Sequence, residues 1–495
     1  MSDSIQPCLG GSGDERTDGY WARRSQVSCC LEGKNAILFD PDSSSEKTIN
    51  ESGYLFWQSM DGCRRIGDLA EILARFYEIP VSEEVKQDVW AFADEMLRDG
   101  FVEIAPIPRN TPIVPELVSS IDEAPRDMDL SLTGKCNLKC EYCFYADEMT
   151  GRRDLPGETW IRFFSELKSL AVRNVTLSGG EVLIREDLWE LIDALIEARM
   201  RYRILSNGTM ISEQTIGHFS VGNRRARLSS IQVSIDGSCP EIHDLSRGRG
   251  SFVKAIRGLR LLKEANFPVT VRVTVNQNNV DDLERIAALL IDEIGLSGFS
   301  TNDAVPIGMG CRHEDRVSLS PEQRSIAMKS LVMLDRRYPG RISASAGSLA
   351  LWRMFHEMEE ARKTGVQATN WRMGYLSSCG CMFYKLAVHH DGTIVPCNML
   401  ASASLGVIGQ TPLKQIWREH PMLVEMRARR DVPMNTVSGC RDCEWNAYCS
   451  GGCPSVEFTR VGNLYLGGQD SCYRRFIAQT GGLPVVDRDE IPGGI

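Results

Sequence analysis

The sequence lacks any apolar run long enough to cross a bilayer. Its best candidate, LWELIDALIEA at residues 188–198, is short and is interrupted by charged residues. The first 20 residues have neither a basic start nor an apolar stretch, so no secretory signal is visible either. We therefore expect a cytoplasmic protein that does not insert into a membrane.

The sequence also lacks an excess of basic residues. Its formal net charge is −10 over 495 residues, which argues against binding to a phosphate backbone and so against a nucleic-acid partner. The imbalance is concentrated in residues 26–105, which hold 16 acidic and 7 basic side chains. Such a segment has either a solvated acidic surface or a docking site for a partner with basic residues.

Cysteine, by contrast, is abundant, with 17 residues. Because cytosolic thiols are kept reduced, cysteines at ligand spacings indicate metal sites before disulfides. Three of them, Cys136, Cys140 and Cys143, fall within the stretch CNLKCEYC. Three thiolates on one short loop can bind three irons of a four-iron cluster and leave the fourth iron open. A structural zinc site would need a fourth ligand close by, and this loop offers none.

Strand-like and helical segments alternate between residues 128 and 304. The six expected strands are MDLSLT, VRNVTLS, YRILSN, SIQVSID, VTVRVTVN and GFSTNDA. Such alternation predicts an α/β fold with a parallel sheet, curled into a partial barrel. The three cysteines follow the first strand, at the carboxyl edge of the sheet, where α/β proteins place their ligands.

Together with SGGE after the second strand, the cysteine loop resembles the radical S-adenosylmethionine (SAM) superfamily. The resemblance implies a partial (β/α)6 barrel and a [4Fe–4S] cluster held by Cys136, Cys140 and Cys143. In that family SAM binds the open iron, and one-electron reduction yields a 5′-deoxyadenosyl radical. The radical then takes a hydrogen atom from the substrate.

The same resemblance implies roles for other residues. Tyr142 would lie against the adenine. The methionine amino group would meet Ser178, Gly179, Gly180 and Glu181. Later strand ends would supply ribose and carboxylate contacts, with candidates Ser206, Asn207, Ser234, Asp236, Asn276 and Arg247. Each of these later polar residues could instead be a helix cap or a turn residue.

Eight more cysteines lie between residues 379 and 472, and their order resembles the SPASM extension of radical SAM enzymes. That resemblance implies two auxiliary iron–sulfur clusters of the [4Fe–4S] type. The first would use Cys379, Cys381, Cys397 and Cys453, although the tight Cys379-x-Cys381 spacing leaves open that one of the two is a free thiol. The second would use Cys440, Cys443, Cys449 and Cys472. Two structural zinc ions are the alternative.

Residues 27–105 resemble the peptide-binding protein of pyrroloquinoline-quinone biosynthesis, a module called the RiPP recognition element. The signs are INESGYLFWQSMDG, LAEILARFYEI and DVWAFADEMLRDGFVEI. We expect a winged-helix-like module with strands VSCCLEG, NAILFD and KTIN and two helices. By resemblance, the leader of a precursor peptide would bind within residues 27–77, in a groove of residues 27–49 and 66–77. A structural cap domain is the alternative.

The sequence thus predicts seven segments. They are a disordered N-terminus (1–26), the peptide-binding module (27–105), a proline-rich linker (106–126), the barrel (127–312), a helical bridge (313–372), the SPASM domain (373–480) and a tail (481–495).

The resemblances imply an enzyme that modifies a ribosomally made precursor peptide, forming a thioether or carbon–carbon cross-link, with a flavodoxin or ferredoxin as reductant. Two other outcomes stay open. Epimerisation would need a hydrogen donor such as Cys311, which could also bind substrate or simply pack; residue dehydrogenation would need no leader-binding module. A non-catalytic scaffold that binds zinc and peptides is the alternative from another class.

Overall fold

The structure is a computed structural model, and it describes residues 19–32, 35–40, 42–43, 45–111, 124–367, 372–376 and 381–484. The chain divides into two compact units. Unit 1 comprises Met1–Ala124 and Leu167–Arg173, and unit 2 comprises Pro125–Glu166 and Asn174–Ile495.

Unit 1 contains the three strands expected between residues 27 and 49. They are β2 (Ser28–Glu32), β3 (Asn35–Asp40) and β4 (Ser45–Ile49), and they form an antiparallel sheet in that order. The two expected helices are α3 (Ile66–Phe76) and α4 (Glu83–Arg98). The Ser82 side chain caps α4 by accepting a hydrogen bond from the Val85 amide. The predictions for these five elements are confirmed.

Unit 1 also holds elements that the sequence did not suggest. Helix α2 (Glu51–Ser59) packs on β3 and β4, whereas α3 packs on α2, α4 and β5. A second antiparallel sheet has the order β5-β1-β6, with β1 (Tyr20–Arg23), β5 (Asp61–Arg64) and β6 (Val102–Ala105). The predicted disorder of residues 1–26 is therefore wrong for residues 20–23, while residues 1–18 lie outside the described part.

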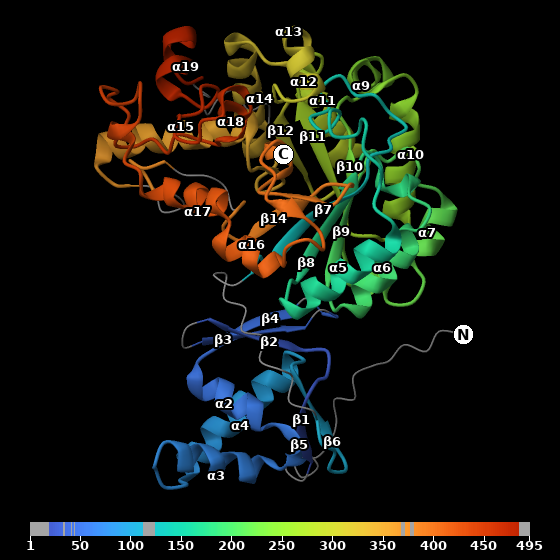
Figure 1. Ribbon diagram of the computed structural model, residues 1–495, viewed down its shortest axis with the longest axis vertical. Helices are drawn as coiled ribbons and strands as arrows, with labels where there is room; N and C mark the ends of the chain where they lie inside the picture. Colours follow the sequence, from blue (N-terminus) through green and yellow to red (C-terminus); the bar gives the residue numbers. More distant parts are fainter. Residues whose placement is uncertain are drawn as a thin grey trace. The chain divides into compact units, whose positions relative to one another are not determined.

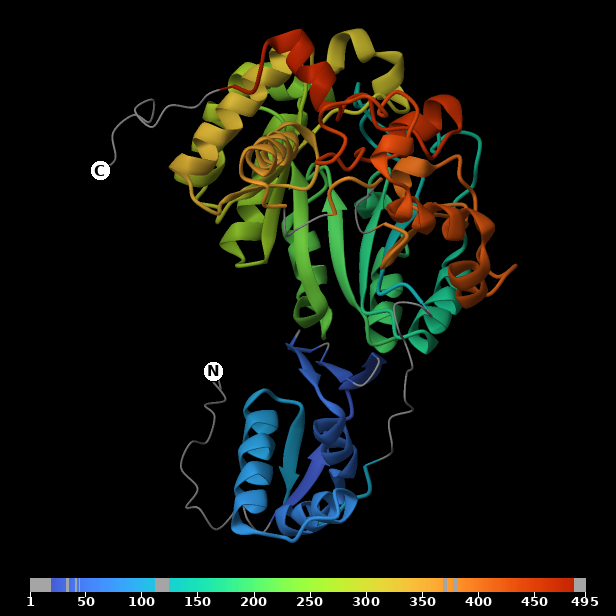
Figure 2. The ribbon, with the colours of Figure 1, turned by 90° about the vertical axis from the view of Figure 1, so that its left-hand side faces the viewer.

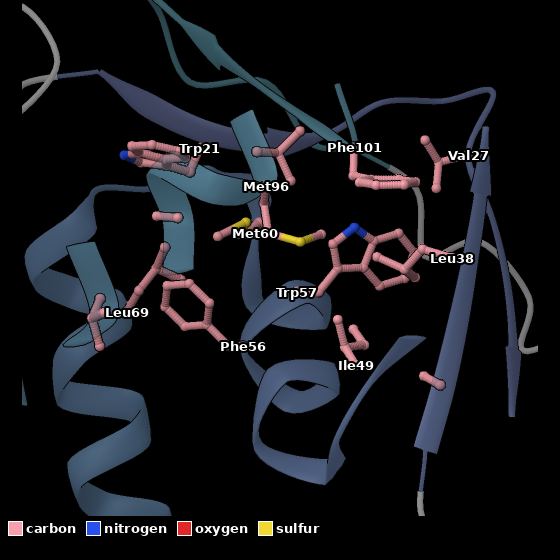
Figure 3. Packing of buried hydrophobic residues seen from close by; sticks show 14 of the residues in the cluster. Trp21, Val27, Leu38, Ile49, Phe56, Trp57, Met60, Leu69, Met96 and Phe101 are labelled. Atoms are coloured by element: carbon pink, nitrogen blue, oxygen red, sulfur yellow. The ribbon is translucent and has the colours of Figure 1, made fainter. Parts of the chain in front are cut away.

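Hydrophobic burial explains why β1 is ordered. Trp21 is fully buried, and its ring meets that of Trp90 edge-on with 6.1 Å between centroids. Figure 3 shows Trp21, Trp57 and Phe101 in one apolar core of unit 1. A four-residue strand is too short to give a clear alternation in the sequence, but the large apolar surface of one tryptophan fixes its place.

Unit 2 is built on a ten-stranded sheet within the described residues. Its order is β13-β12-β11-β10-β9-β8-β7-β14-β15-β16. Strands β7 to β14 run parallel to their neighbours, and β15 and β16 are antiparallel. The strands are β7 (Asp127–Thr133), β8 (Asn174–Gly179), β9 (Arg201–Ser206), β10 (Leu228–Ser234), β11 (Val269–Val275), β12 (Phe299–Asp303), β13 (Ile342–Ala344), β14 (Lys385–Val388), β15 (Thr393–Val395) and β16 (Gly406–Val407).

Helices follow most of these strands, as Figure 1 shows for α6, α7 and α10 beside β8–β10. In the barrel they are α5 (Gly157–Ser169), η1 (Val182–Ile184), α6 (Leu188–Glu197), α7 (Glu213–Phe219), α8 (Arg224–Arg227), α9 (Pro240–Arg247), α10 (Ser251–Glu264), η2 (Val280–Asp282), α11 (Leu283–Ala287), the π-helical turn η3 (Ala288–Glu293) and α12 (Met309–Arg312). The curvature of the sheet, seen in Figure 2, gives the predicted partial barrel.

Besides strands β14–β16, the C-terminal part of unit 2 consists of helices and turns, of which α14 and α15 are long and the others short. They are α13 (Glu314–Val317), α14 (Pro321–Arg337), α15 (Gly347–Thr364), η4 (Asn398–Leu400), α16 (Leu413–Glu419), α17 (Pro421–Ala428), η5 (Arg429–Asp431), η6 (Met434–Thr436), α18 (Ser455–Val461) and α19 (Tyr473–Thr480). In the described ranges, no helix is long and apolar enough to span a membrane.

One predicted boundary needs correction, and one predicted segment holds an additional element. The bridge at residues 313–372 is mostly helical, as expected, and it also contains β13, which extends the sheet beside β12. The linker at residues 106–126 begins later than expected, because the Arg109 and Thr111 amides donate to the carbonyls of Gly62 and Asp61 at 2.9 and 2.7 Å. Both segments are too short and polar to show a strand period, and neighbouring strands supply their hydrogen bonds.

Candidate active site

The loop that carries Cys136, Cys140 and Cys143 follows β7 and is joined to the loop after β8. The Gly180 amide donates to the Thr133 carbonyl, and the Glu181 amide donates to the Lys135 carbonyl, both at 2.8 Å. A Cβ atom on Gly180 would lie 2.2 Å from the Lys135 carbonyl oxygen, so only glycine fits there. The SGGE segment therefore holds the cysteine loop at close range.

The three thiols of this loop lie near enough to influence one another. The pKa of Cys140 is raised to about 12, chiefly by burial and in part by the Cys143 and Cys136 thiols, whereas Arg247 opposes the shift. Burial likewise raises the pKa of Cys136 and of Cys143. Buried thiolates need a cation in place of their protons, and the donor set of three clustered thiols fits three irons of a [4Fe–4S] cluster.

Glu181, Ser206 and Asn207 form a buried junction between the loops after β8 and β9. The Glu181 carboxylate accepts hydrogen bonds from the Ser206 hydroxyl at 2.9 Å and from the Asn207 amide at 2.7 Å. The Asn207 side chain donates to Asn137 in the cysteine loop at 2.9 Å. Burial raises the pKa of Glu181, against the hydrogen bonds that lower it. Three predicted site residues are thus brought together beside the thiols.

Tyr142, Asp236 and Arg247 form a second junction. The Asp236 carboxylate accepts from the Tyr142 hydroxyl, from Arg247 Nε at 2.5 Å and from the Thr274 amide at 2.7 Å. The Arg247 guanidinium carbon lies 5.6 Å from the centroid of the Tyr142 ring. Two residues predicted to contact SAM, Asp236 and Arg247, therefore pair with each other.

Asn276 is fully buried and organises the loop after β11. Its side-chain oxygen accepts from the Asn278 amide at 2.9 Å and from the Ser246 hydroxyl at 3.3 Å. Its side-chain nitrogen donates to the Thr274 carbonyl at 3.0 Å. Sequence reasoning missed Ser246 and Asn278. The polar run VNQNNV at a strand end pointed to Asn278, whereas Ser246 lies in α9 and no local signal links it to this loop. Ser234 ends β10 and is half-buried.

Cys311 is exposed and lies in α12, next to the cysteine loop. The Met309 amide donates to the Cys143 carbonyl at 3.0 Å. Gly308 adopts φ 61°, and a Cβ atom there would meet the Cys143 carbonyl oxygen at 2.7 Å. The loop after β12 thus packs directly on the loop that carries the three thiols.

Tyr145 anchors the other end of the cysteine loop. Its hydroxyl lies 2.9 Å from His390 Nδ1 in the turn between β14 and β15. His389 and His390 are fully buried there, and His389 Nδ1 lies 3.5 Å from the Glu148 carboxylate. No local signal in the sequence connects this histidine pair with the cysteine loop, because the contact depends on β14 pairing beside β7.

The four thiols of Cys440, Cys443, Cys449 and Cys472 also lie together. The pKa of Cys449 is raised to about 11, chiefly by burial and in part by the thiols of Cys472, Cys440 and Cys443. Burial and the same neighbours raise the pKa of Cys440. This grouping matches the four ligands expected for the second auxiliary cluster.

Cys381, Cys397 and Cys453 occupy a different region. The Lys385 ammonium, paired with Asp129 at 2.8 Å, interacts with the thiols of both Cys381 and Cys397. Cys453 precedes α18, which packs on η4 directly after Cys397. Cys379 lies outside the described residues. In the described part, no three His, Cys, Asp or Glu side chains converge on one metal ion, whereas a cluster binds each thiolate through a different iron.

Three family models match the chain in order. They are the PqqD protein of coenzyme PQQ synthesis (residues 35–102), the radical SAM superfamily (130–290) and the SPASM iron–sulfur cluster-binding domain (379–444). This chain is a radical SAM protein with PqqD and SPASM domains. The predicted domain set, fold class and cofactor classes, namely SAM and iron–sulfur clusters, are thereby confirmed.

Named relatives match this chain over most of its length. The chain is 26% identical to an AdoMet-dependent heme synthase of Methanosarcina barkeri, over 72% of this chain and 98% of that protein. It is 27% identical to a PqqA peptide cyclase of Ruegeria pomeroyi, over 69% of this chain and 85% of the relative. The structure of Streptococcus suis SuiB bound to its precursor peptide SuiA matches with a TM-score of 0.62 and 14% identity, over 91% of this chain and 99% of SuiB.

Proposed function

We propose that this chain modifies a ribosomally made precursor peptide by hydrogen abstraction at the carboxyl edge of β7–β12. The observation that carries the proposal is the group of three coupled thiols after β7, in a chain that also holds a PqqD domain. The peptide cyclase relative and the likeness to peptide-bound SuiB support a peptide substrate. The heme synthase relative leaves a tetrapyrrole as a second candidate, and the PqqD domain weighs against it.

Cys136, Cys140 and Cys143 would hold the cluster that, with bound SAM, supplies a 5′-deoxyadenosyl radical on one-electron reduction. Gly179 and Gly180 permit close backbone approach to SAM. Glu181, on the same segment, complements the methionine ammonium. A flavodoxin or ferredoxin would supply the electron.

The remaining SAM contacts are revised by the geometry. Asp236 and Asn276 direct their polar atoms into the protein, so we assign them to support of the site rather than to SAM itself. Arg247 uses Nε for Asp236, and its other guanidinium donors stay assigned to the SAM carboxylate. Tyr142 and Ser234 remain assigned to the adenosine.

The leader of the precursor would add as a strand to the β2–β3–β4 sheet, within residues 27–77. Strands β2 and β4 are the outer strands of this sheet, so their backbone groups can pair with an added peptide. The helix beside the sheet is α2, not α3, which corrects the expected groove of residues 27–49 and 66–77. The acidic excess of this segment favours a leader with basic residues.

Two auxiliary clusters, on the cysteine groups after residue 379, would accept the electron left after hydrogen abstraction or bind substrate. A net oxidation favours a thioether or carbon–carbon cross-link over epimerisation. Cys311 is the candidate hydrogen donor if the product is an epimer, because α12 packs on the cysteine loop and the thiol is exposed.

The test is metal and product analysis of anaerobically reconstituted protein. About twelve irons per chain, at four per cluster, and 5′-deoxyadenosine formed with dithionite would support the proposal. Mass spectrometry of candidate precursors would then separate cross-linking or dehydrogenation, which removes two hydrogens, from epimerisation at unchanged mass. Zinc with little iron and intact SAM would instead indicate the non-catalytic scaffold.

A further inference from the structure

The Asp236 side chain joins three parts of the fold and is not placed to contact a ligand. Asp236 follows β10, its side chain is fully buried, and its carboxylate receives three hydrogen bonds from the protein. The partners are Tyr142 of the cysteine loop, Arg247 at the end of α9, and the backbone of β11 at Thr274. A carboxylate used in this way fixes the positions of its partners.

The last turn of α9 is clasped onto the cysteine loop between Cys140 and Cys143. The Glu141 amide donates to the Ser246 carbonyl at 2.9 Å. Arg247 and Tyr142, which follow Ser246 and Glu141 in the sequence, form the second contact, in which the Arg247 guanidinium lies over the Tyr142 ring. The contact between α9 and the cysteine loop therefore has two parts. The backbone hydrogen bond does not depend on the side chains, whereas the contact between Arg247 and Tyr142 depends on Asp236.

The charged part of this contact lies beside the thiols. Tyr142 stands between Cys140 and Cys143 in the sequence, and the Arg247 guanidinium carbon lies 5.6 Å from the centroid of its ring. The Asp236 carboxylate accepts hydrogen bonds from both Tyr142 and Arg247, so one cation and one anion lie beside this loop. A cluster on three thiolates gains one more negative charge on reduction, so a nearby cation favours the reduced form and a nearby anion favours the oxidised form.

We infer that Asp236 is a positioning residue that holds Tyr142 and Arg247 against the cysteine loop and, by partly neutralising Arg247, lowers the reduction potential of the cluster there. This inference rests on the proposed assignment of Cys136, Cys140 and Cys143 as cluster ligands. Removing the Asp236 charge leaves the buried guanidinium uncompensated, so the cluster becomes easier to reduce. Removing the Arg247 charge has the opposite effect.

The test is a redox titration of the full-length, cluster-loaded protein. Electron paramagnetic resonance monitors the titration, and the signal that is read is that of the reduced cluster whose spectrum changes when SAM is added. In Asp236→Asn, the ratio of reduced to oxidised cluster at fixed potential should rise about tenfold, which is a midpoint shift of about 59 mV for one electron. Arg247→Gln should shift the midpoint in the opposite direction.

Asp282→Asn is the matched control, because Asp282 is also a buried carboxylate paired with an arginine, Arg285, at 2.6 Å. Its midpoint should equal that of the wild type. An unchanged midpoint in Asp236→Asn at full iron content, or shifts of the same sign in Asp236→Asn and Arg247→Gln, would overturn the inference. If Asp236→Asn fails to load iron, the sign of the Arg247→Gln shift decides alone. Absence of any SAM-responsive signal in the wild type would instead overturn the ligand assignment.

Discussion

The loop of Cys136, Cys140 and Cys143 and the segment of Cys440, Cys443 and Cys449 hold their thiols in different ways. The first lies between regular strands and is fixed by side chains from three other strand ends, among them Asp236 and Asn207. The second lies in residues 429–454, whose only described helical turns are η5 and η6. It packs on two apolar clusters, one around Leu376, Met434 and Val437 and the other around Phe355, Trp445 and Tyr473.

The difference suggests two kinds of metal site: one whose ligands are positioned by the fold, and one whose metal stabilises the fold around it. Strands β7–β12 are held by backbone pairing and by buried apolar side chains, so we expect the fold itself to form the first site. The auxiliary segment has few backbone ladders, so we expect metal binding to supply part of its folding free energy. The following predictions test this contrast, from the largest expected effect on activity and hydrogen exchange to the smallest, and the last one concerns stability.

Loss of a thiol from the barrel loop should remove activity but not the fold. We expect Cys140→Ala to reduce 5′-deoxyadenosine formation at least about 100-fold while about eight irons remain in the auxiliary sites. Iron analysis and product chromatography measure both. Cys63→Ala, an exposed cysteine of β5 outside every thiol group, is the control and should keep full activity. Loss of all iron from Cys140→Ala would contradict the independence of the sites.

Removal of iron should loosen the auxiliary segment and spare the barrel. After chelation under reducing conditions, we expect amides of residues 432–454 to lose at least about tenfold of their protection from hydrogen exchange, because their site supplies folding free energy. Amides of β8–β11 should keep their protection. The measurement is hydrogen exchange read by mass spectrometry. Equal loss in both regions would mean that the barrel also depends on its cluster.

A methyl group should be tolerated beside one site and not beside the other. In Gly180→Ala the new Cβ would lie 2.2 Å from the Lys135 carbonyl oxygen, so the loops after β7 and β8 must separate. In Gly467→Ala the nearest atom would be Cys440 Sγ at 3.7 Å, an ordinary contact. We expect SAM cleavage to fall about tenfold in the first variant and less than about twofold in the second. Comparable rates in the two variants would argue against a rigid barrel site.

The sequence predicted those parts of both sites that depend on local spacing. The thiol groups and the strands β7–β12 follow from motifs and periodicity within short windows. It did not predict that Asp236 would pair with Arg247, that α2 would cover β3 and β4, or that β14 would bring His390 to Tyr145. These contacts depend on which strands lie side by side, and residues as far apart as 145 and 390 give no common local signal.

The last prediction concerns stability and is a pH dependence confined to the barrel. His243 is buried in α9, and its Nδ1 accepts a hydrogen bond from the Asp236 amide at 3.0 Å. Burial lowers the pKa of His243 to about 4. As the pH falls below the ordinary pKa of histidine, His243 is protonated in the unfolded chain but not in the folded barrel. The free energy of unfolding therefore decreases.

The loss should reach about 2 kcal/mol at pH 5 relative to pH 7. Hydrogen exchange of β10 amides in iron-free protein, corrected for the intrinsic rate at each pH, measures it. His243→Gln should remove most of this dependence, because glutamine can accept the same hydrogen bond but does not titrate. The segment 431–454 contains no histidine and serves as the internal control. Equal stability of the wild-type barrel at pH 5 and pH 7 would contradict this prediction. It would mean that His243 is protonated in the folded state, and the barrel site would then be less rigid than its hydrogen bonds imply.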